Sequence, residues 1–133
     1  MAEKSIHDAL GATHPEGGEQ ITLFLPSKDR NGIDINQEKW RDKALDCFGR
    51  LFRGATAFPP GKGVWRDDEN DGRLIHDETI MIVTYISEKV LWEQMGELRK
   101  FLHKLGRETN QGEVGIIIND SYHGISVYDK NEV

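Results

Sequence analysis

Several short stretches of the chain have the pattern of β-strands, in which apolar side chains alternate with polar ones or run together. The first stretch, residues 21–27, alternates and stops at Pro26. The third, residues 78–86, is nearly continuous in apolar residues, which is typical of a central strand that is covered on at least one face. The second ends at Pro59 and Pro60, which interrupt strand pairing. The four predicted strands are residues 21–27, 55–58, 78–86 and 113–118, and residues 122–128 can add a short extra strand.

Two longer stretches carry apolar residues at steps of three and four, which predicts amphipathic helices. The first helix begins after Asn36, whose side chain can cap it, and ends at Gly54. The second begins after Ser87 and ends at Gly106. The apolar faces consist of Trp40, Ala44, Cys47, Phe48 and Leu51 in the first helix and Leu91, Met95, Leu98, Leu102 and Leu105 in the second.

The order of these elements is strand, helix, strand, strand, helix, strand. Right-handed crossovers place both helices on the same face of one sheet. This order predicts an α+β fold of the ferredoxin-like βαββαβ type, with a four-stranded antiparallel sheet and two helices on one face. We expect a flexible N-terminal tail at residues 1–20 and a single domain at residues 21–129. The uncovered face of the sheet predicts a homo-oligomer, with a trimer preferred and a dimer as the alternative.

Composition limits the partners of this domain. A chain of 133 residues fits one domain, and its net charge of −6 argues against general nucleic-acid binding. The sequence contains no apolar run of transmembrane length, and its first residues do not resemble a secretory signal. The single cysteine, Cys47, is on the apolar side of a predicted helix, which favours an inert core thiol in a reducing cytoplasm.

A basic, glycine-containing segment is the first candidate ligand site. Between Cys47 and Arg66 the chain has no acidic residue, and Gly61 and Gly63 flank Lys62. Arginine can hold phosphate or carboxylate through two hydrogen bonds, and glycine lets the backbone approach a ligand closely. The alternative is that the cations only pair with the acidic residues that follow them. The cations of this segment are Arg50, Arg53, Lys62 and Arg66.

The end of the second helix is another candidate, because polar side chains gather there just before a buried strand. Asn110 and Gln111 can read donor and acceptor groups on a ligand, and Arg107 can hold a phosphate. The alternative is an ordinary helix exit whose polar groups satisfy the local backbone. The cluster also includes Lys104, Glu108 and Gly112.

The acidic turn after Trp65 has three interpretations. Its acids match a calcium-loop template in spacing, but the flanking helices of such a loop are missing. Asp67 and Asp68 could instead hold metal ions for phosphate chemistry, with His76 as a base. Because metal chemistry needs carboxylates on rigid elements, we favour a solvated hairpin turn without a metal.

In its order of elements the chain resembles the PII-like superfamily of small trimeric sensors, which share this core with the CutA-like proteins. Three features carry the resemblance across residues 21–118: the glycine-led strand at 54–56, the long excursion with GKG and Trp65, and the segment 108–118. In that superfamily the excursion is a large flexible loop and the last segment is a nucleotide-binding loop. The strongly acidic excursion departs from the better-known nitrogen regulators. The resemblance implies an oligomeric ligand-binding module.

These observations lead to two functional hypotheses. The favoured one is a non-catalytic regulatory module that binds a small anionic ligand, or a nucleotide, between subunits and needs no cofactor. The alternative is a metal-dependent phosphoesterase or nucleotidyl-transfer enzyme that uses the acidic hairpin. The ligand-binding residues of the first hypothesis are Lys62, Gly63, Trp65, Arg66, Arg107, Asn110 and Gln111.

Overall fold

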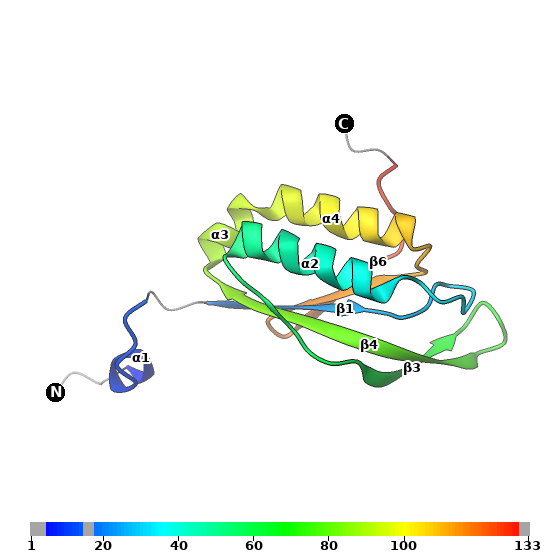
Figure 1. Cartoon of the computed structure of the whole chain (residues 1–133), viewed down its shortest axis with the longest axis horizontal. Coiled ribbons are helices and arrows are strands. Elements are labelled where there is room, and N and C mark those ends of the chain that lie inside the picture. Colours follow the sequence, from blue (N-terminus) through cyan, green and yellow to red (C-terminus); the bar gives the residue numbers. More distant parts are fainter. Residues whose placement is uncertain (1–4, 15–17, 131–133) are drawn as a thin grey trace.

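The computed structural model describes residues 5–14 and 18–130 of the chain. A short helix, α1, lies apart from the body, and two long helices pack on a sheet (Figure 1). The elements are α1 (Ile6–Ala9), β1 (Glu19–Leu25), α2 (Gln37–Phe52), β2 (Thr56–Ala57), β3 (Gly61–Asp67), β4 (Arg73–Ile86), α3 (Glu88–Glu93), α4 (Met95–Glu108), β5 (Val114–Ile118) and β6 (Ser121–Ile125).

The strands differ in length and form one antiparallel sheet. Five of them lie in the order β2-β4-β1-β5-β6, and β3 also pairs with β4. The predicted α+β architecture with an antiparallel sheet is therefore present. Within the described residues the sheet has six strands where we predicted four, because residues 61–67 of the excursion form the additional strand β3 and the extra strand β6 also forms.

Helices α2 and α4 cover one face of the sheet (Figure 1). Along β1, Leu23 and Leu25 are fully buried, whereas Phe24 between them is only half-buried because it points to the opposite face. On the second half of β4 the same alternation leaves Met81 and Tyr85 exposed. The core between sheet and helices includes Ile21, Leu23, Leu25, Trp40, Ala44, Phe48, Phe52, Ile80, Ile82, Ile86, Leu91, Leu98, Leu102, Leu105, Val114 and Ile116.

Both predicted helix caps are confirmed. The side chain of Asn36 accepts a hydrogen bond from the backbone of Lys39, and that of Ser87 accepts one from Val90. Helix α2 ends one residue earlier than predicted, because Arg53 and not Gly54 takes the left-handed conformation, with φ of 74°. None of the described helices is long and apolar enough to cross a bilayer.

The second predicted helix differs from expectation at two places. It is divided into α3 and α4 at Gln94, and it continues past Gly106 to Glu108. Gly106 is buried, and a Cβ atom there would overlap the ring of Tyr128. This glycine therefore makes room for a tertiary contact and does not end the helix.

The excursion, which is a flexible loop in the PII-like superfamily, is a β-hairpin in this protein, and its acidic part forms the turn. Residues 61–67 form β3, which pairs with residues 73–79 of β4, so that β4 is fourteen residues long. Strand β1 begins at Glu19, inside the segment predicted as a tail. Because β1 pairs with residues 80–86 of β4, the hairpin extends beyond the part of β4 that pairs with β1.

We predict that Gly106→Ala destabilises the protein by about 1–3 kcal/mol, because the added methyl group must displace the ring of Tyr128. Gly96→Ala in the same helix is the matched control, since a Cβ atom at Gly96 meets nothing within 4 Å. The control should gain about 0.5–1 kcal/mol from the better helix propensity of alanine. Denaturant unfolding of both variants measures these changes, and equal effects would contradict the packing role.

Candidate functional site

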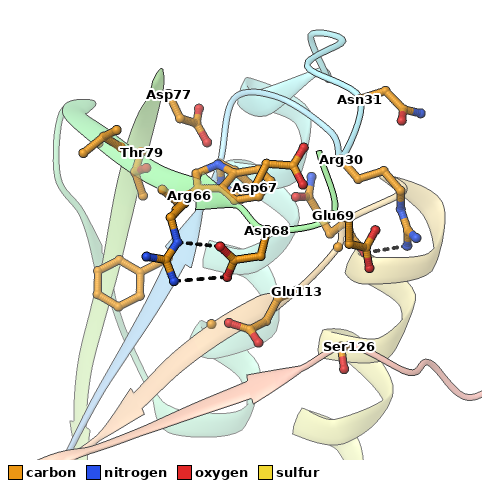
Figure 2. A pocket seen from close by; sticks show the side chains of 18 of the residues that line it. Arg30, Asn31, Arg66, Asp67, Asp68, Glu69, Asp77, Thr79, Glu113 and Ser126 are labelled. Carbon is orange, nitrogen blue, oxygen red and sulfur yellow. Dashed lines mark hydrogen bonds and ion pairs between the residues drawn. The ribbon is translucent and has the colours of Figure 1, made fainter. Parts of the chain in front are cut away.

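A concavity of about 840 Å³ lies where the β3–β4 hairpin approaches the sheet. Three segments distant in sequence border it: the hairpin, the loop between β1 and α2, and the region from the end of α4 into β5 and β6 (Figure 2). Its floor includes Phe24, Gly115 and Tyr122. These positions alternate with core positions on their strands, which places the pocket on the sheet face opposite the helices.

Positions from both faces of the hairpin strand β3, residues 63–67, border this pocket. Gly63 lies opposite Asp77 in the register, and Trp65 lies opposite Ile75. The turn closes through Asp67, whose carbonyl oxygen accepts hydrogen bonds from the backbone of Asn70 and Gly72. Gly72 has a φ of 67°, a left-handed conformation that glycine adopts without steric cost.

The carboxylate of Asp67 is part of this turn. It accepts a hydrogen bond from the Asn70 side chain at 2.8 Å and lies 3.5 Å from Arg73. The hydrogen bond from Asn70 and the neighbouring Arg73 guanidinium hold the pKa of Asp67 below its usual range. Asp67 therefore remains ionised at neutral pH and adds negative charge to the pocket.

The loop after β1 is attached to the hairpin strand by Asp77. The Asp77 carboxylate is buried and accepts hydrogen bonds from the backbone N–H of Ser27, at 2.8 Å, and from the Ser27 hydroxyl. That hydroxyl also accepts a hydrogen bond from the backbone of Glu78 at 3.1 Å. These contacts hold the β1–α2 loop against strand β4 at one side of the pocket.

The loop between α4 and β5 is attached to the β1–α2 loop by Gln111 and Arg30. The side-chain amide of Gln111 donates to the carbonyl of Lys28 at 3.0 Å, and Arg30 Nη2 donates to the carbonyl of Gln111 at 2.9 Å. The hydroxyl of Tyr128 donates to the same carbonyl at 2.8 Å. Gln111 is buried, so its amide holds the two loops together and is not directed at a ligand.

Negative charge dominates the lining of the pocket. Among the described residues, five carboxylates and two guanidinium groups border it. The carboxylates belong to Asp67, Asp68, Glu69, Asp77 and Glu113, and the guanidinium groups belong to Arg30 and Arg66. Asp68 pairs with Arg66, with Nε and Oδ1 2.5 Å apart (Figure 2). That contact raises the pKa of Arg66 and compensates part of its positive charge. The remaining excess is negative, which attracts cations and repels anions.

The structure brings together four of the seven residues predicted to bind ligand. Gly63, Trp65, Arg66 and Gln111 all line the pocket, although they come from two segments that the sequence places 45 residues apart or more. Lys62 does not border the pocket and lies opposite Glu78 in the register. The predicted basic patch is divided as well, because Arg53 borders a different concavity near Phe52.

Arg107 and Asn110 do not border this pocket, and both make contacts within the chain. Arg107 Nη1 donates to the carbonyl of Asp129 at 2.5 Å and holds the C-terminal segment. Asn110 has a φ of 50° at the exit of α4, and its carbonyl accepts from the backbone of Arg30 at 3.0 Å. Its side chain hydrogen-bonds Asp29.

The metal-dependent alternative requires a cluster of metal-binding side chains, and residues 5–14 and 18–130 contain no such cluster. No group of three His, Cys, Asp or Glu side chains in these ranges is arranged to hold a metal ion. Asp67 and His76 occupy alternate positions of the hairpin ladder and so face opposite sides. His103 on α4 is buried, and its Nδ1 accepts a hydrogen bond from the backbone of Asp129 at 2.8 Å.

The residues of the pocket that the sequence did not indicate include Arg30, Glu113 and Tyr122. Arg30 lies in a polar loop that carries no ligand motif. A signal for the other two was present, because Gly115 and Gly124 interrupt the strands next to them. Glycine inside a strand often marks a close approach of another group.

Tyr122 provides a pH-dependent reporter of the pocket. Burial and the neighbouring Glu113 raise the pKa of Tyr122 to about 12. The protonated phenol is therefore favoured by folding, and its stabilising contribution is present below about pH 10 and lost as the pH rises toward 12. We predict that Glu113→Gln lowers the pKa of Tyr122 only partly, because burial remains.

Ultraviolet absorbance of the phenolate during alkaline titration measures this shift, and Tyr122→Phe assigns the transition. A wild-type Tyr122 that titrates like an exposed tyrosine would contradict the contact.

Comparisons with known proteins support the fold. No protein-family model matches the chain. No curated protein matches it either. Among solved structures, a phage SAM lyase in complex with S-methyl-5'-thioadenosine is similar, with a TM-score of 0.66 and 14% identity over 85% of this chain and 92% of that chain. A phage SAM lyase in the apo state has a TM-score of 0.58 and 15% identity over 86% of this chain and 94% of that chain. The chain thus shares its fold with phage SAM lyase.

Proposed function

We propose that this protein is a small-ligand-binding module whose pocket takes an adenosine-type nucleoside that is neutral or positively charged. The first candidates are S-methyl-5'-thioadenosine and the sulfonium compound S-adenosylmethionine. The observation that carries the proposal is the acidic concavity beside Trp65, assembled from three segments on the open face of the sheet. Trp65 is 42% exposed, so its ring is accessible to a ligand base.

The charge of the pocket selects among nucleosides. The sequence favoured an anionic ligand, which Arg30 and Arg66 would have to hold. Since five carboxylates surround those two cations, a ligand with several phosphates meets repulsion, whereas a sulfonium or ammonium group is attracted. We therefore change the proposed ligand from a nucleotide to a nucleoside without phosphate.

The shared fold supports the choice of candidates. The solved relative with the TM-score of 0.66 is described with S-methyl-5'-thioadenosine, a neutral adenosine thioether. A fold can carry unrelated functions. The structural similarity therefore only suggests which ligands to test first, and the support for them comes from the chemistry of the pocket. It also favours a second candidate function, lyase activity on S-adenosylmethionine.

We further propose a cytoplasmic homo-oligomer, preferably a trimer, built on a ferredoxin-like, PII-like core. Met81 and Tyr85 are exposed on β4 at the open face, at 40% and 64%. Burial of this apolar surface against another copy would stabilise the assembly and place the pocket beside a subunit contact. Light scattering should give the mass of an oligomer, and a monomer at micromolar concentration would contradict this proposal.

Binding is tested by thermal shift and calorimetry with S-methyl-5'-thioadenosine, S-adenosylmethionine and ATP. The first two should stabilise the protein, by about 2.7 kcal/mol at 100 times their dissociation constants, and ATP should bind more weakly. Trp65→Ala should remove most of this stabilisation. Trp92→Ala is the matched control, because Trp92 is also exposed, at 66%, but lies on α3 and does not border the pocket.

Two outcomes would contradict the binding proposal. If ATP binds more tightly than the two nucleosides, the anionic-ligand hypothesis is favoured. If Mg²⁺ or Ca²⁺ alone stabilises the protein and this stabilisation is lost in Asp67→Ala, the metal-dependent alternative is favoured. Mass spectrometry of the S-adenosylmethionine mixtures detects cleavage and so tests the second candidate function.

A further inference from the structure

Two glycines face each other across β5 and β6 on the floor of the pocket. Gly115 and Gly124 are directly paired in the register. A Cβ atom on Gly115 would lie 2.5 Å from the hydroxyl of Tyr122, and one on Gly124 would lie 2.5 Å from the carboxyl carbon of Glu113. The two glycines therefore leave room for Tyr122 and Glu113 to lie flat across the sheet.

These two side chains meet above the glycines. The hydroxyl of Tyr122 donates a hydrogen bond to Oε2 of Glu113 at 2.6 Å. Because the phenol keeps its proton at neutral pH, as its raised pKa requires, the direction of this hydrogen bond is fixed. The Glu113–Tyr122 pair is thus oriented by the missing side chains at positions 115 and 124 and by its own hydrogen bond.

The pair offers hydrogen-bond acceptors to the pocket. Glu113 and Tyr122 both line it, and Figure 2 shows Glu113 between Asp68 of the hairpin and Ser126. Within residues 5–14 and 18–130, Oε1 of Glu113 accepts no hydrogen bond, and the Tyr122 oxygen keeps a lone pair. The matching ligand group must therefore bring two neighbouring donors.

We propose that the Glu113–Tyr122 pair accepts hydrogen bonds from the vicinal 2'- and 3'-hydroxyls of a ribose and makes the pocket specific for ribonucleosides. This inference rests on the proposed nucleoside function and names the part of the ligand that is recognised. A carboxylate is a strong acceptor for hydroxyl donors and is the group that binds a ribose 2'-hydroxyl in dinucleotide-binding folds. A ligand without the hydroxyl leaves such an acceptor unpaired, and so it is rejected.

The test compares S-methyl-5'-thioadenosine with its 2'-deoxy analogue by calorimetry on the full chain. Wild type should prefer the ribonucleoside by about ten- to hundredfold, as expected for a hydrogen bond to a charged group. Glu113→Gln should reduce this preference to a few-fold, and Tyr122→Phe should reduce it because Glu113 loses its orientation. Gly115→Ala should have the same effect, because its methyl group displaces the Tyr122 hydroxyl.

Glu69→Gln is the matched control. Glu69 also lines the pocket, so this variant removes one negative charge as Glu113→Gln does, and it should keep the preference for ribose. Unfolding curves show that each variant is folded before affinities are compared.

The outcomes separate the two proposals. Equal affinity of wild type for both nucleosides, or an equal loss of preference in Glu69→Gln, overturns the ribose contact and leaves nucleoside binding intact. If neither nucleoside binds, the proposed function is wrong and the ribose contact with it.

Discussion

Burial of one face of the sheet under two helices is the constraint on which the rest of the structure depends. The side chains of Leu23 and Leu25 are fully buried against the helices, and Phe48 and Leu98 cover them from the other side. A fully buried side chain of this size contributes about 1.5–3 kcal/mol, so these contacts fix the register of the central strands. Because strand side chains alternate, this register also decides which residues remain on the open face. The pocket is built from that second set.

The open face becomes a site because the hairpin extends beyond the paired region of β4. Its walls are held by a few buried polar contacts, above all Asp77 with Ser27 and Gln111 with the loop that carries Arg30. Such contacts contribute modestly to stability, but each would leave an unpaired buried group if it were broken. They therefore give the pocket a defined shape without contributing much to the core. The carboxylates that remain at its rim set the sign of its potential.

Glycine has a different role here from the one its position in the sequence indicates. Gly106 matched a helix stop, yet it is buried inside α4 under Tyr128. Gly115 and Gly124 interrupt strands, and their missing side chains let Tyr122 and Glu113 lie across the sheet. In each case the reason is a side chain that arrives from elsewhere in the chain. The spacing of apolar residues along the chain does not show which side chain from another segment will pack against a glycine.

The sequence by itself determined the two long helices, the central strands and the covered face. Local chemistry decides these features, since the caps at Asn36 and Ser87 and the apolar steps of the two helices depend on residues within a few positions. It also indicated Trp65 and Arg66 as candidate ligand-binding residues, because they lie beside glycines in a segment without acidic residues. Only the tertiary structure decided that Gln111 ties two loops, that β3 pairs with β4, and that the pocket carries an excess of carboxylates. Those facts depend on contacts between segments far apart in the chain, and the charge of a site is the sum over all the segments that meet there.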